Sequence, residues 1–192
     1  MSSDKIVILT GAGISAESGL GTFRDEGGLW AQHRIEDVAT PEGFAKDPDL
    51  VMAFYNARRA QAATAQPNSA HQALARLQHD YDGEVVIVTQ NVDALHERGG
   101  ASDVLHMHGE LAKGLCGACG VRWDTTGDMH RDDPCPSCAR PASRPGIVWF
   151  GEMPYFMDDI FAHLAEATIF ASIGTSGEVY PAAGFVREAN AH

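Results

Sequence analysis

Short apolar runs alternate with amphipathic segments along most of this chain. Three β-branched, apolar runs, at 5–10, 84–89 and 168–173, are too short for helices, and each predicts a buried strand. Two shorter strands are expected at 104–108 and 147–150. Helical spacing predicts helices from Ser15, after Pro41, after Asp47, from Ser69, over 157–167 and over 181–192. This alternation predicts an α/β fold, a Rossmann-like doubly wound parallel sheet that binds ligands at the carboxyl ends of its strands.

The composition changes between residues 109 and 145, where Cys, Gly, Pro, Asp and Arg predominate. A length of 192 residues exceeds the ~100 to 150 residues of one typical domain without reaching two. We therefore expect a main domain formed by 1–108 and 146–192, with a helical insertion at about 34–66, and a small accessory module at 109–145.

Four cysteines in the accessory module form two Cys-x-x-Cys pairs, Cys116 with Cys119 and Cys135 with Cys138. The 15 residues between the pairs match the spacing of four-thiolate zinc sites. Four sulfur ligands leave no open position for water, so the sequence predicts one structural Zn²⁺ in a zinc ribbon rather than a catalytic metal.

A glycine turn follows the first predicted strand. Gly11, Ala12 and Gly13 begin a G-x-G-x-x-A pattern, in which small residues let backbone N–H groups approach a pyrophosphate. An ordinary turn between a strand and a helix fits equally well. The ribose-binding acid expected about 20 residues later at the end of a second strand is missing, because Glu36 and Asp37 lie in no strand-like segment. Any dinucleotide would therefore be bound in an unorthodox way.

Two further polar groups follow predicted strands. The segment Gln90-Asn91-Val92-Asp93 lies where α/β proteins place their sites, although Asn and Asp are also common turn residues. His106 and His108 are spaced i, i+2 on one face of a short strand and could be a metal pair, a base or hydrogen-bonded structural residues. Spacing alone favours the turn and the structural histidines.

The charge of the chain limits its partners. Fourteen Lys and Arg residues against 26 Asp and Glu give a net charge of −12, which repels nucleic acid and anionic lipid. The apolar run Ile6–Leu9 is too brief to span a bilayer, and Met1 is not followed by a secretory signal. We expect a cytoplasmic protein that binds neither membrane nor nucleic acid; its oligomeric state is not predicted.

Taken together, the motifs resemble the sirtuins, NAD-dependent protein-lysine deacylases, and most of all the bacterial branch that also removes acidic acyl groups. The matching motifs are Gly11-Ala12-Gly13-Ile14-Ser15-Ala16-Glu17-Ser18-Gly19, Thr22-Phe23-Arg24, Gln90-Asn91-Val92-Asp93, His108-Gly109-Glu110-Leu111, the four cysteines, Val148-Trp149-Phe150-Gly151-Glu152 and Gly174-Thr175-Ser176. Their order along the chain makes the resemblance specific.

The resemblance implies that NAD is consumed as a cosubstrate. The implied cofactor-binding residues are Gly11, Ala12, Gly13, Ser15, Glu17, Phe23, Arg24, Trp30, Gln90, Asn91, Val92, Asp93, Gly174, Thr175 and Ser176. In the family, the glycine loop and Arg24 would hold phosphates, Phe23 would cover the reacting ribose carbon, and Asp93 would receive the nicotinamide amide. His108 would be the general base, with Asn91 beside the ribose, because a neutral imidazole can take a proton from a ribose hydroxyl.

The implied reaction transfers an acyl group, acetyl and also succinyl or malonyl, from a protein lysine to ADP-ribose, releasing nicotinamide and 2′-O-acyl-ADP-ribose. The acylated lysine segment would bind as an added strand between Trp149-Phe150-Gly151-Glu152 and the segment containing Val179. Tyr55 and Arg58, spaced i, i+3 on a predicted helix, match the Tyr-x-x-Arg that binds acidic acyl groups in that branch.

Two features depart from the family. Gly21 stands where most members have a residue with a side chain, and the chain ends after one predicted helix, without the family's later strands. We expect either a fragment or a chain completed by a partner. Two other functions remain open from the residues themselves: a nicotinamide-dependent oxidoreductase, supported by the glycine turn alone, and a noncatalytic zinc-ribbon module that binds protein or nucleic acid, the latter opposed by the negative charge.

Overall fold

A four-stranded parallel sheet forms the centre of the computed structural model, which describes residues 4–21 and 32–191. The strand order is β3-β2-β1-β7. The strands are β1 (Lys5–Thr10), β2 (Glu84–Thr89), β3 (Leu105–His106) and β7 (Ile169–Ile173). The chain leaves β1 to form β2 on one side and returns to form β7 on the other, so the strand order reverses beside β1. Ligand crevices of open α/β sheets lie at such a point.

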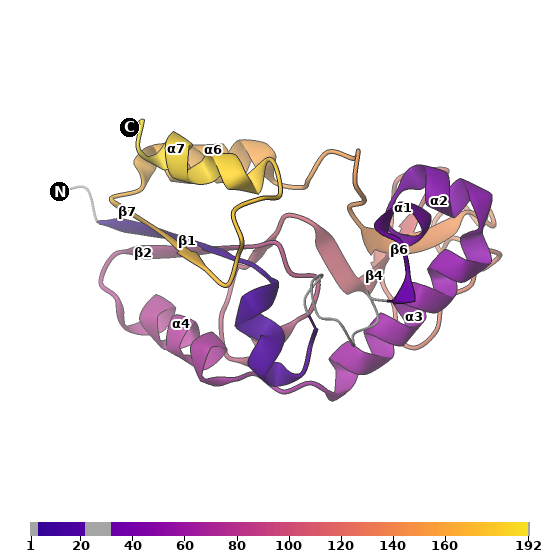
Figure 1. The fold of residues 1–192 in the computed structure, drawn as a ribbon, viewed down its shortest axis with the longest axis horizontal. Helices are drawn as coiled ribbons and strands as arrows, with labels where there is room; N and C mark the ends of the chain where they lie inside the picture. Colours follow the sequence, from indigo (N-terminus) through magenta and orange to yellow (C-terminus); the bar gives the residue numbers. More distant parts are fainter. Residues whose placement is uncertain (1–3, 22–31, 192) are drawn as a thin grey trace.

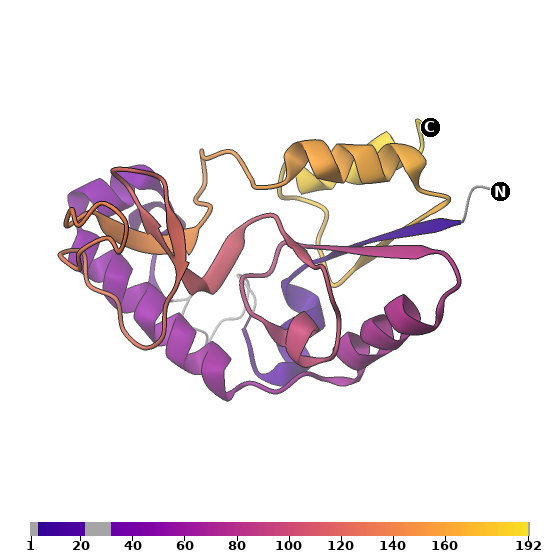
Figure 2. The same ribbon diagram turned by 180° about the vertical axis from the view of Figure 1, so that it is seen from behind.

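Helices cover both faces of this sheet (Figures 1 and 2). One face carries α6 (Met157–Glu166), η3 (Ala182–Gly184) and α7 (Phe185–Ala189). The other carries η1 (Ala12–Ser18), α4 (Ser69–Asp80) and α5 (Leu95–Arg98). The predicted doubly wound α/β fold is confirmed.

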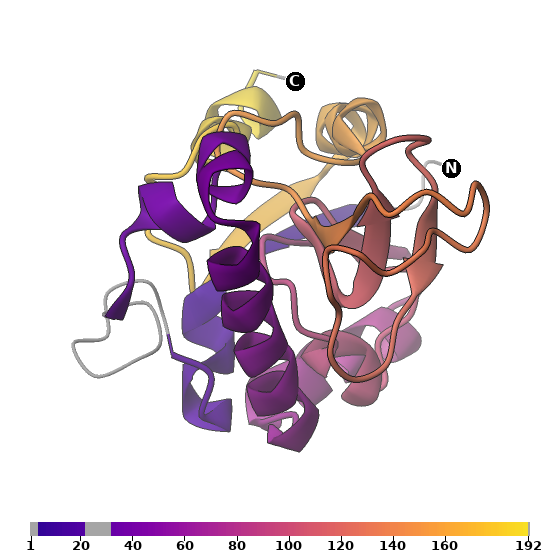
Figure 3. The same cartoon turned by 90° about the vertical axis from the view of Figure 1, so that its right-hand side faces the viewer.

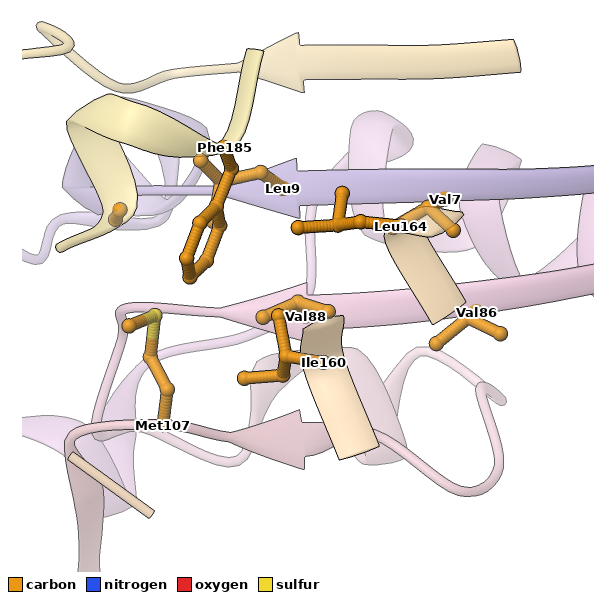
Figure 4. Packing of buried hydrophobic residues seen from close by; sticks show 9 residues of the cluster. Val7, Leu9, Val86, Val88, Met107, Ile160, Leu164 and Phe185 are labelled. Carbon is orange, nitrogen blue, oxygen red and sulfur yellow. The ribbon is translucent and has the colours of Figure 1, made fainter. Parts of the chain in front are cut away.

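The apolar residues of the strands pack in two layers. On the α6 side, Val7 and Val88 pack with Ile160, Leu164 and Phe185, all at most 1% exposed (Figure 4). On the α4 side, a second cluster joins β1 and β2 to that helix. Truncating a fully buried Leu to Ala typically costs ~2 to 5 kcal/mol, so each layer contributes strongly to the stability of the sheet.

A second group of elements lies beyond the carboxyl ends of the parallel strands (Figures 1 and 3). It contains an antiparallel sheet in the order β5-β4-β6 and three helices. The elements are α1 (Ile35–Val38), α2 (Pro41–Lys46), α3 (Pro48–Thr64), β4 (Gly109–Cys116), β5 (Arg122–Asp124) and β6 (Ser143–Ile147). A shared cluster that includes Phe54, Tyr55, Leu111 and Trp149 packs α3 against this sheet.

Sequence features explain where α2 and α3 begin. The Thr40 hydroxyl accepts the Gly43 N–H at 3.0 Å, and the Asp47 carboxylate accepts the Leu50 N–H at 3.0 Å. Proline occupies the first turn of both helices, where no backbone donor is required. The predicted starts after Pro41 and Asp47 are thus confirmed.

The strand expected at 147–150 is wrong. Strand β6 runs from Ser143 and ends at Ile147, because the Trp149 N–H is taken by the Glu152 carboxylate at 2.8 Å and cannot continue a ladder. A turn follows, in which Gly151 has a φ of +90°.

Three other expected elements are shorter or differently built. Strand β3 covers 105–106 instead of 104–108, since the chain turns at Gly109, which has a φ of +81° and opens β4. The helix expected from Ser15 is the 3₁₀ segment η1, which begins at Ala12. The single helix expected over 181–192 is divided into η3 and α7.

No helix within residues 4–21 and 32–191 is both long enough and apolar enough to cross a membrane.

Candidate active site and metal centre

A cavity of about 410 Å³ lies where β1, β2 and β7 end and the second group of elements begins. All described site residues predicted for cofactor or substrate, except Glu17, line it, and so does His108. Glu17 is exposed on η1. Phe23, Arg24 and Trp30 lie outside the described residues. The structure therefore brings these predicted residues together from six separate segments of the chain.

The glycine turn packs tightly against the end of β7. The N–H of Gly11 donates to the carbonyl of Ile173 at 3.1 Å, and the N–H of Gly13 donates to the carbonyl of Gly174 at 2.8 Å. A Cβ on Gly13 would lie 2.9 Å from the Gly174 oxygen, which explains the need for glycine there. Because both amides have protein acceptors, the expected phosphate contacts of this loop have to come from its other groups.

Ser15, Asn91 and Asp93 form a hydrogen-bonded group in the cavity wall. The Ser15 hydroxyl donates to Asp93 Oδ2 at 3.2 Å and accepts the Asn91 side-chain amide at 3.1 Å. The other Asp93 oxygen accepts the Leu95 N–H at 3.0 Å. The three side chains come from η1 and from the loop after β2, and all three residues are buried. They present a fixed carboxylate and amide to a polar ligand.

A buried histidine layer supports this group. His71 from α4 lies 3.4 Å from the Ser15 hydroxyl, and its ring packs edge-to-face on that of His96 from α5. His96 Nε2 lies 2.9 Å from the Thr10 hydroxyl, which donates to Thr89. Burial lowers the pKa of His71, and burial together with His71 lowers the pKa of His96 to about 4. Both rings are therefore neutral at pH 7.

His108 lines the same side of the cavity. Its Nδ1 is 3.2 Å from the carbonyl oxygen of Gln90. Since a carbonyl only accepts hydrogen bonds, this contact assigns the ring proton to Nδ1 and leaves Nε2 as a proton acceptor. Burial lowers the pKa of His108, against a smaller opposing effect of the Gln90 carbonyl. His108 thus has the tautomer and charge of a general base at neutral pH.

The opposite wall is built around Trp149. The Arg144 guanidinium lies 3.5 Å from the centre of the Trp149 indole and binds the Glu152 carboxylate through two nitrogens, at 2.6 and 2.9 Å. Although burial opposes ionisation, the bonds from Arg144 and the Trp149 N–H lower the pKa of Glu152. This network fixes the segment after β6 that faces the sheet.

Tyr55 and Arg58 project from α3 into the cavity between these walls. The Tyr55 side chain is buried, and burial raises the pKa of its hydroxyl despite the opposing charge of Arg58. The Arg58 guanidinium carbon is 5.8 Å from the centre of the Tyr55 ring. The pair places a positive charge and a hydroxyl at one end of the cavity.

Several cavity-lining residues belong to none of the motifs identified in the sequence. They are Leu20, Ala39, Gln61, Ala62, Ile147 and Pro154. Most are apolar or small residues without reactive groups, and only the tertiary fold brings them to the site.

The four cysteines converge at the far end of the antiparallel sheet, with all four Sγ atoms within 4.8 Å of one another. The Sγ atoms of Cys116 and Cys138 are 3.7 Å apart, as are those of Cys119 and Cys135. These distances exclude disulfides and match the ~3.8 Å between sulfurs in a tetrahedron with Zn–S bonds of ~2.3 Å.

The backbone supports the same interpretation. The N–H of Ala118 donates to Cys116 Sγ and that of Ser137 to Cys135 Sγ, both at 3.4 Å, so each Cys-x-x-Cys turn offers its sulfur an equivalent donor. Such donors stabilise thiolates, so the residues present fit a structural Zn²⁺. The metal would hold two loops that have little apolar core of their own.

The family model described as "Sir2 family" matches residues 11–181. The chain belongs to the Sir2 family. The sirtuin resemblance inferred from the sequence motifs is confirmed.

Named Sir2 relatives are similar along nearly the whole chain. A protein of Vibrio vulnificus (strain YJ016) named "NAD-dependent protein deacylase" is 58% identical over 190 residues, covering 97% of this chain and 78% of that protein. A protein of the same name from Escherichia coli (strain K12) is 57% identical over 195 residues, covering 100% and 70%.

Solved Sir2 structures share the fold. A Sir2 homologue in complex with NAD superimposes with a TM-score of 0.90 at 40% identity, covering 98% of this chain and 75% of that one. Sir2Tm bound to a propionylated peptide gives 0.78 at 29%, covering 97% and 78%. The predicted Rossmann-like class is therefore confirmed for this chain.

Proposed function

We propose that this protein removes acyl groups from protein lysines by transferring them to the ADP-ribose part of NAD, with release of nicotinamide. The single observation that carries the proposal is the shared cavity, in which His108, Asn91 and Asp93 from the parallel sheet face Trp149 and Glu152 from the opposite wall. The relatives named as NAD-dependent protein deacylases, and the Sir2 structures with NAD and with an acylated peptide, support it.

In this proposal, one wall of the cavity binds NAD and the other binds the acylated substrate. NAD supplies an electrophilic ribose carbon when bound. Asp93 would receive the nicotinamide amide and Asn91 the ribose, while Phe23 and Arg24 remain predicted contacts of the ribose and phosphates. In the predicted reaction, the acyl oxygen bonds to ribose C1′ as nicotinamide leaves, and a ribose hydroxyl then attacks the acyl carbon. His108 takes the proton of that hydroxyl at Nε2. One water molecule then adds and the bond between the acyl carbon and the lysine nitrogen breaks, which releases the free lysine amine and leaves the acyl group on the ribose.

The substrate chain would bind on the wall that carries Trp149 to Glu152, opposite Val179. Both segments line the cavity. Pairing through backbone hydrogen bonds would accept many peptide sequences, because these bonds do not involve the side chains of the peptide. The partner is thus the acylated lysine of a protein, in keeping with the acylated-peptide complex of a Sir2 relative.

For the acyl group we propose that Arg58 and Tyr55 bind the carboxylate of succinyl or malonyl lysine. A guanidinium binds a carboxylate bidentately, and the tyrosine hydroxyl adds a third bond. The Tyr55 hydroxyl accepts the Trp149 indole N–H at 3.1 Å, so its own O–H can donate to the substrate. An acetyl group lacks the carboxylate that these donors recognise.

We also propose the domain division expected from the sequence, with a Rossmann-like part from 1–108 and 146–192, a helical insertion at about 34–66 and a zinc ribbon at 109–145. The thiols cluster as metal ligands rather than as disulfides, which supports a reducing compartment and hence a cytoplasmic location.

A reaction with NAD and an acetyl- or succinyl-lysine peptide tests the proposal against its alternatives. A deacylase releases nicotinamide only when the acylated peptide is present, and forms no NADH. An oxidoreductase would form NADH without releasing nicotinamide. A noncatalytic zinc-ribbon module would leave NAD and peptide unchanged.

A further inference from the structure

His106 and His108 lie two residues apart, but only His108 lines the cavity. His106 lies on β3 with 5% of its surface exposed. Its Nε2 is 2.7 Å from Glu97 Oε1, and its Nδ1 is 3.0 Å from the backbone carbonyl oxygen of Asn91. The ring therefore spans the space between helix α5 and the loop that carries the cavity residues.

Both partners of His106 are hydrogen-bond acceptors. The Asn91 carbonyl only accepts, and the Glu97 side chain is 40% exposed, so water can keep its carboxylate ionised. A neutral imidazole has only one N–H. Its other ring nitrogen would be an acceptor facing either the Asn91 carbonyl or the Glu97 carboxylate, with no hydrogen between them. Only the doubly protonated ring satisfies both, so the geometry assigns an imidazolium to His106 at neutral pH.

The charges around the ring agree with this assignment. Glu97 lies on α5 and Glu110 on β4, and both attract a cation, whereas His96 on α5 is neutral because its pKa is about 4. Strand β2 faces the ring with Thr89, which has no charge. Burial opposes the positive charge, but Glu97 outweighs it and the pKa of His106 is raised above its ordinary value. The pKa of Glu97 is correspondingly lowered by His106 despite burial.

Asn91 is the link from this ion pair to the cavity. Its backbone N–H donates to the Thr89 hydroxyl at 3.0 Å, its side-chain amide donates to Ser15, and its carbonyl accepts from His106. The hydrogen bond from His106 thus fixes the position of the Asn91 carbonyl. The residue just before it, Gln90, has the carbonyl that orients His108. Loss of the proton from His106 would remove either this contact or the bond to Glu97.

We propose that protonated His106, paired with Glu97, is a positioning residue that holds Asn91 in place for catalysis, so that activity declines when the ring loses its proton. This proposal rests on the proposed deacylase function. It assigns opposite protonation requirements to two neighbouring histidines: His108 acts as the neutral base, and His106 acts as the cation. The pH profile of kcat/KM is therefore expected to have an acidic limb from His108 and an alkaline limb that includes His106.

Three variants separate the two contacts of the ring. Glu97→Gln removes the charge that keeps His106 protonated. His106→Asn keeps a donor near the Nδ1 position, toward the Asn91 carbonyl, and His106→Gln keeps one near the Nε2 position, toward Glu97. His79→Asn is the matched control, because His79 is an exposed histidine 2.8 Å from the Asp80 carboxylate and remote from the cavity.

The first readout is the NMR titration of the histidine ring protons in the full chain, with His106 assigned by its absence in His106→Asn. We expect the pKa of His106 to lie above 6.5 and to fall by about one unit or more in Glu97→Gln. The second readout is kcat/KM against pH. We expect Glu97→Gln to move the alkaline limb to lower pH by the same shift, and His106→Asn to remove that limb with a loss of a few fold. We expect kcat/KM of His106→Gln to fall ~10-fold, because Asn91 would no longer be held in the geometry that the reaction needs.

A ring that titrates at or below 6.5, or an alkaline limb that does not move in Glu97→Gln, would overturn the proposal. Should the wild-type protein deacylate no peptide at any pH, the proposed function fails by itself. In that case the NMR titration and the affinity for ADP-ribose still test the role of His106. The affinity of the wild type is expected to weaken when the pH exceeds the pKa of the His106 ring, and the affinity of His106→Asn is not.

Discussion

The indole N–H of Trp149 donates to the hydroxyl of Tyr55 at 3.1 Å, which joins the segment after β6 to helix α3 inside the cavity wall. Trp149 is in turn covered by the Arg144 guanidinium. Tyr55 is thus held on one side by the indole, and Arg58 lies one turn further along the same helix. The relationship gives the proposed acyl site a rigid base.

Replacing Arg58 by Met tests the selectivity of this site. We expect desuccinylation to fall ~10- to 100-fold through weaker substrate binding, because charge-assisted hydrogen bonds contribute ~1.5 to 3 kcal/mol each and 1.4 kcal/mol corresponds to tenfold. Deacetylation should change little or improve. Steady-state kinetics on matched acetyl and succinyl peptides measures both, with Arg76→Met, an exposed arginine on α4, as the control. Equal losses on both peptides would contradict acyl recognition by Arg58.

Replacing His108 by Ala should lower deacylation at least ~100-fold while leaving the fold intact, because a positioned general base contributes ~10² to 10⁴ in rate. Nicotinamide exchange should survive better, since the base acts after nicotinamide leaves. Because burial lowers the pKa of His108, the acidic limb of wild-type kcat/KM should have its midpoint below pH 6.5, the ordinary pKa of histidine. Near-normal turnover of the variant would remove His108 from the mechanism.

His96 should make the fold sensitive to acid. The folded pKa of about 4 lies below the ordinary 6.5, so between these values the unfolded chain binds more protons and stability increases with pH. A shift of roughly 2.5 units corresponds to about 3 kcal/mol, lost as pH falls from 6.5 to 4.

His96→Gln keeps a donor to the Thr10 hydroxyl and removes the titration. Denaturant unfolding at several pH values should therefore show a flatter pH dependence in His96→Gln than in the wild type. His79→Gln, at an exposed histidine, should behave like the wild type. An unchanged pH dependence in His96→Gln would show that His96 does not carry the acid sensitivity.

Removing the metal, or replacing Cys138 by Ser, should unfold the loops around the four cysteines and abolish activity indirectly. Metal binding supplies folding free energy to a module with so small a core. Metal analysis should find one Zn²⁺ per chain, and hydrogen exchange should increase around Cys116–Cys119 and Cys135–Cys138 after chelation. Full activity of a zinc-depleted protein would contradict this role.

Local patterns predicted the regular parts of this fold well. The bounds of β1 and β2 follow from short β-branched runs that are buried on both faces, and the cysteine spacing predicted the clustered thiols. In contrast, the strand expected at 147–150 fails because a side chain, Glu152, takes the backbone N–H that a ladder would use. That competition has no signature in hydrophobic periodicity.

The contacts within the site were also not predictable from local sequence patterns. Spacing alone could not separate the cavity-lining His108 from His106, whose ring contacts Glu97, because β3 ends at His106 and the two residues do not share a strand. Nor could it show that the amides of Gly11 and Gly13 are used by the end of β7, more than 160 residues away. These contacts depend on which strands become neighbours in the sheet.

The identity and stoichiometry of the acylated product test the central claim most directly. Mass spectrometry of a complete reaction with NAD and a succinyl-lysine peptide should find one 2′-O-succinyl-ADP-ribose and one nicotinamide for each lysine released. Acyl release as succinate at first detection, with no acyl-ADP-ribose and no loss of NAD, would contradict acyl transfer to ADP-ribose at this site.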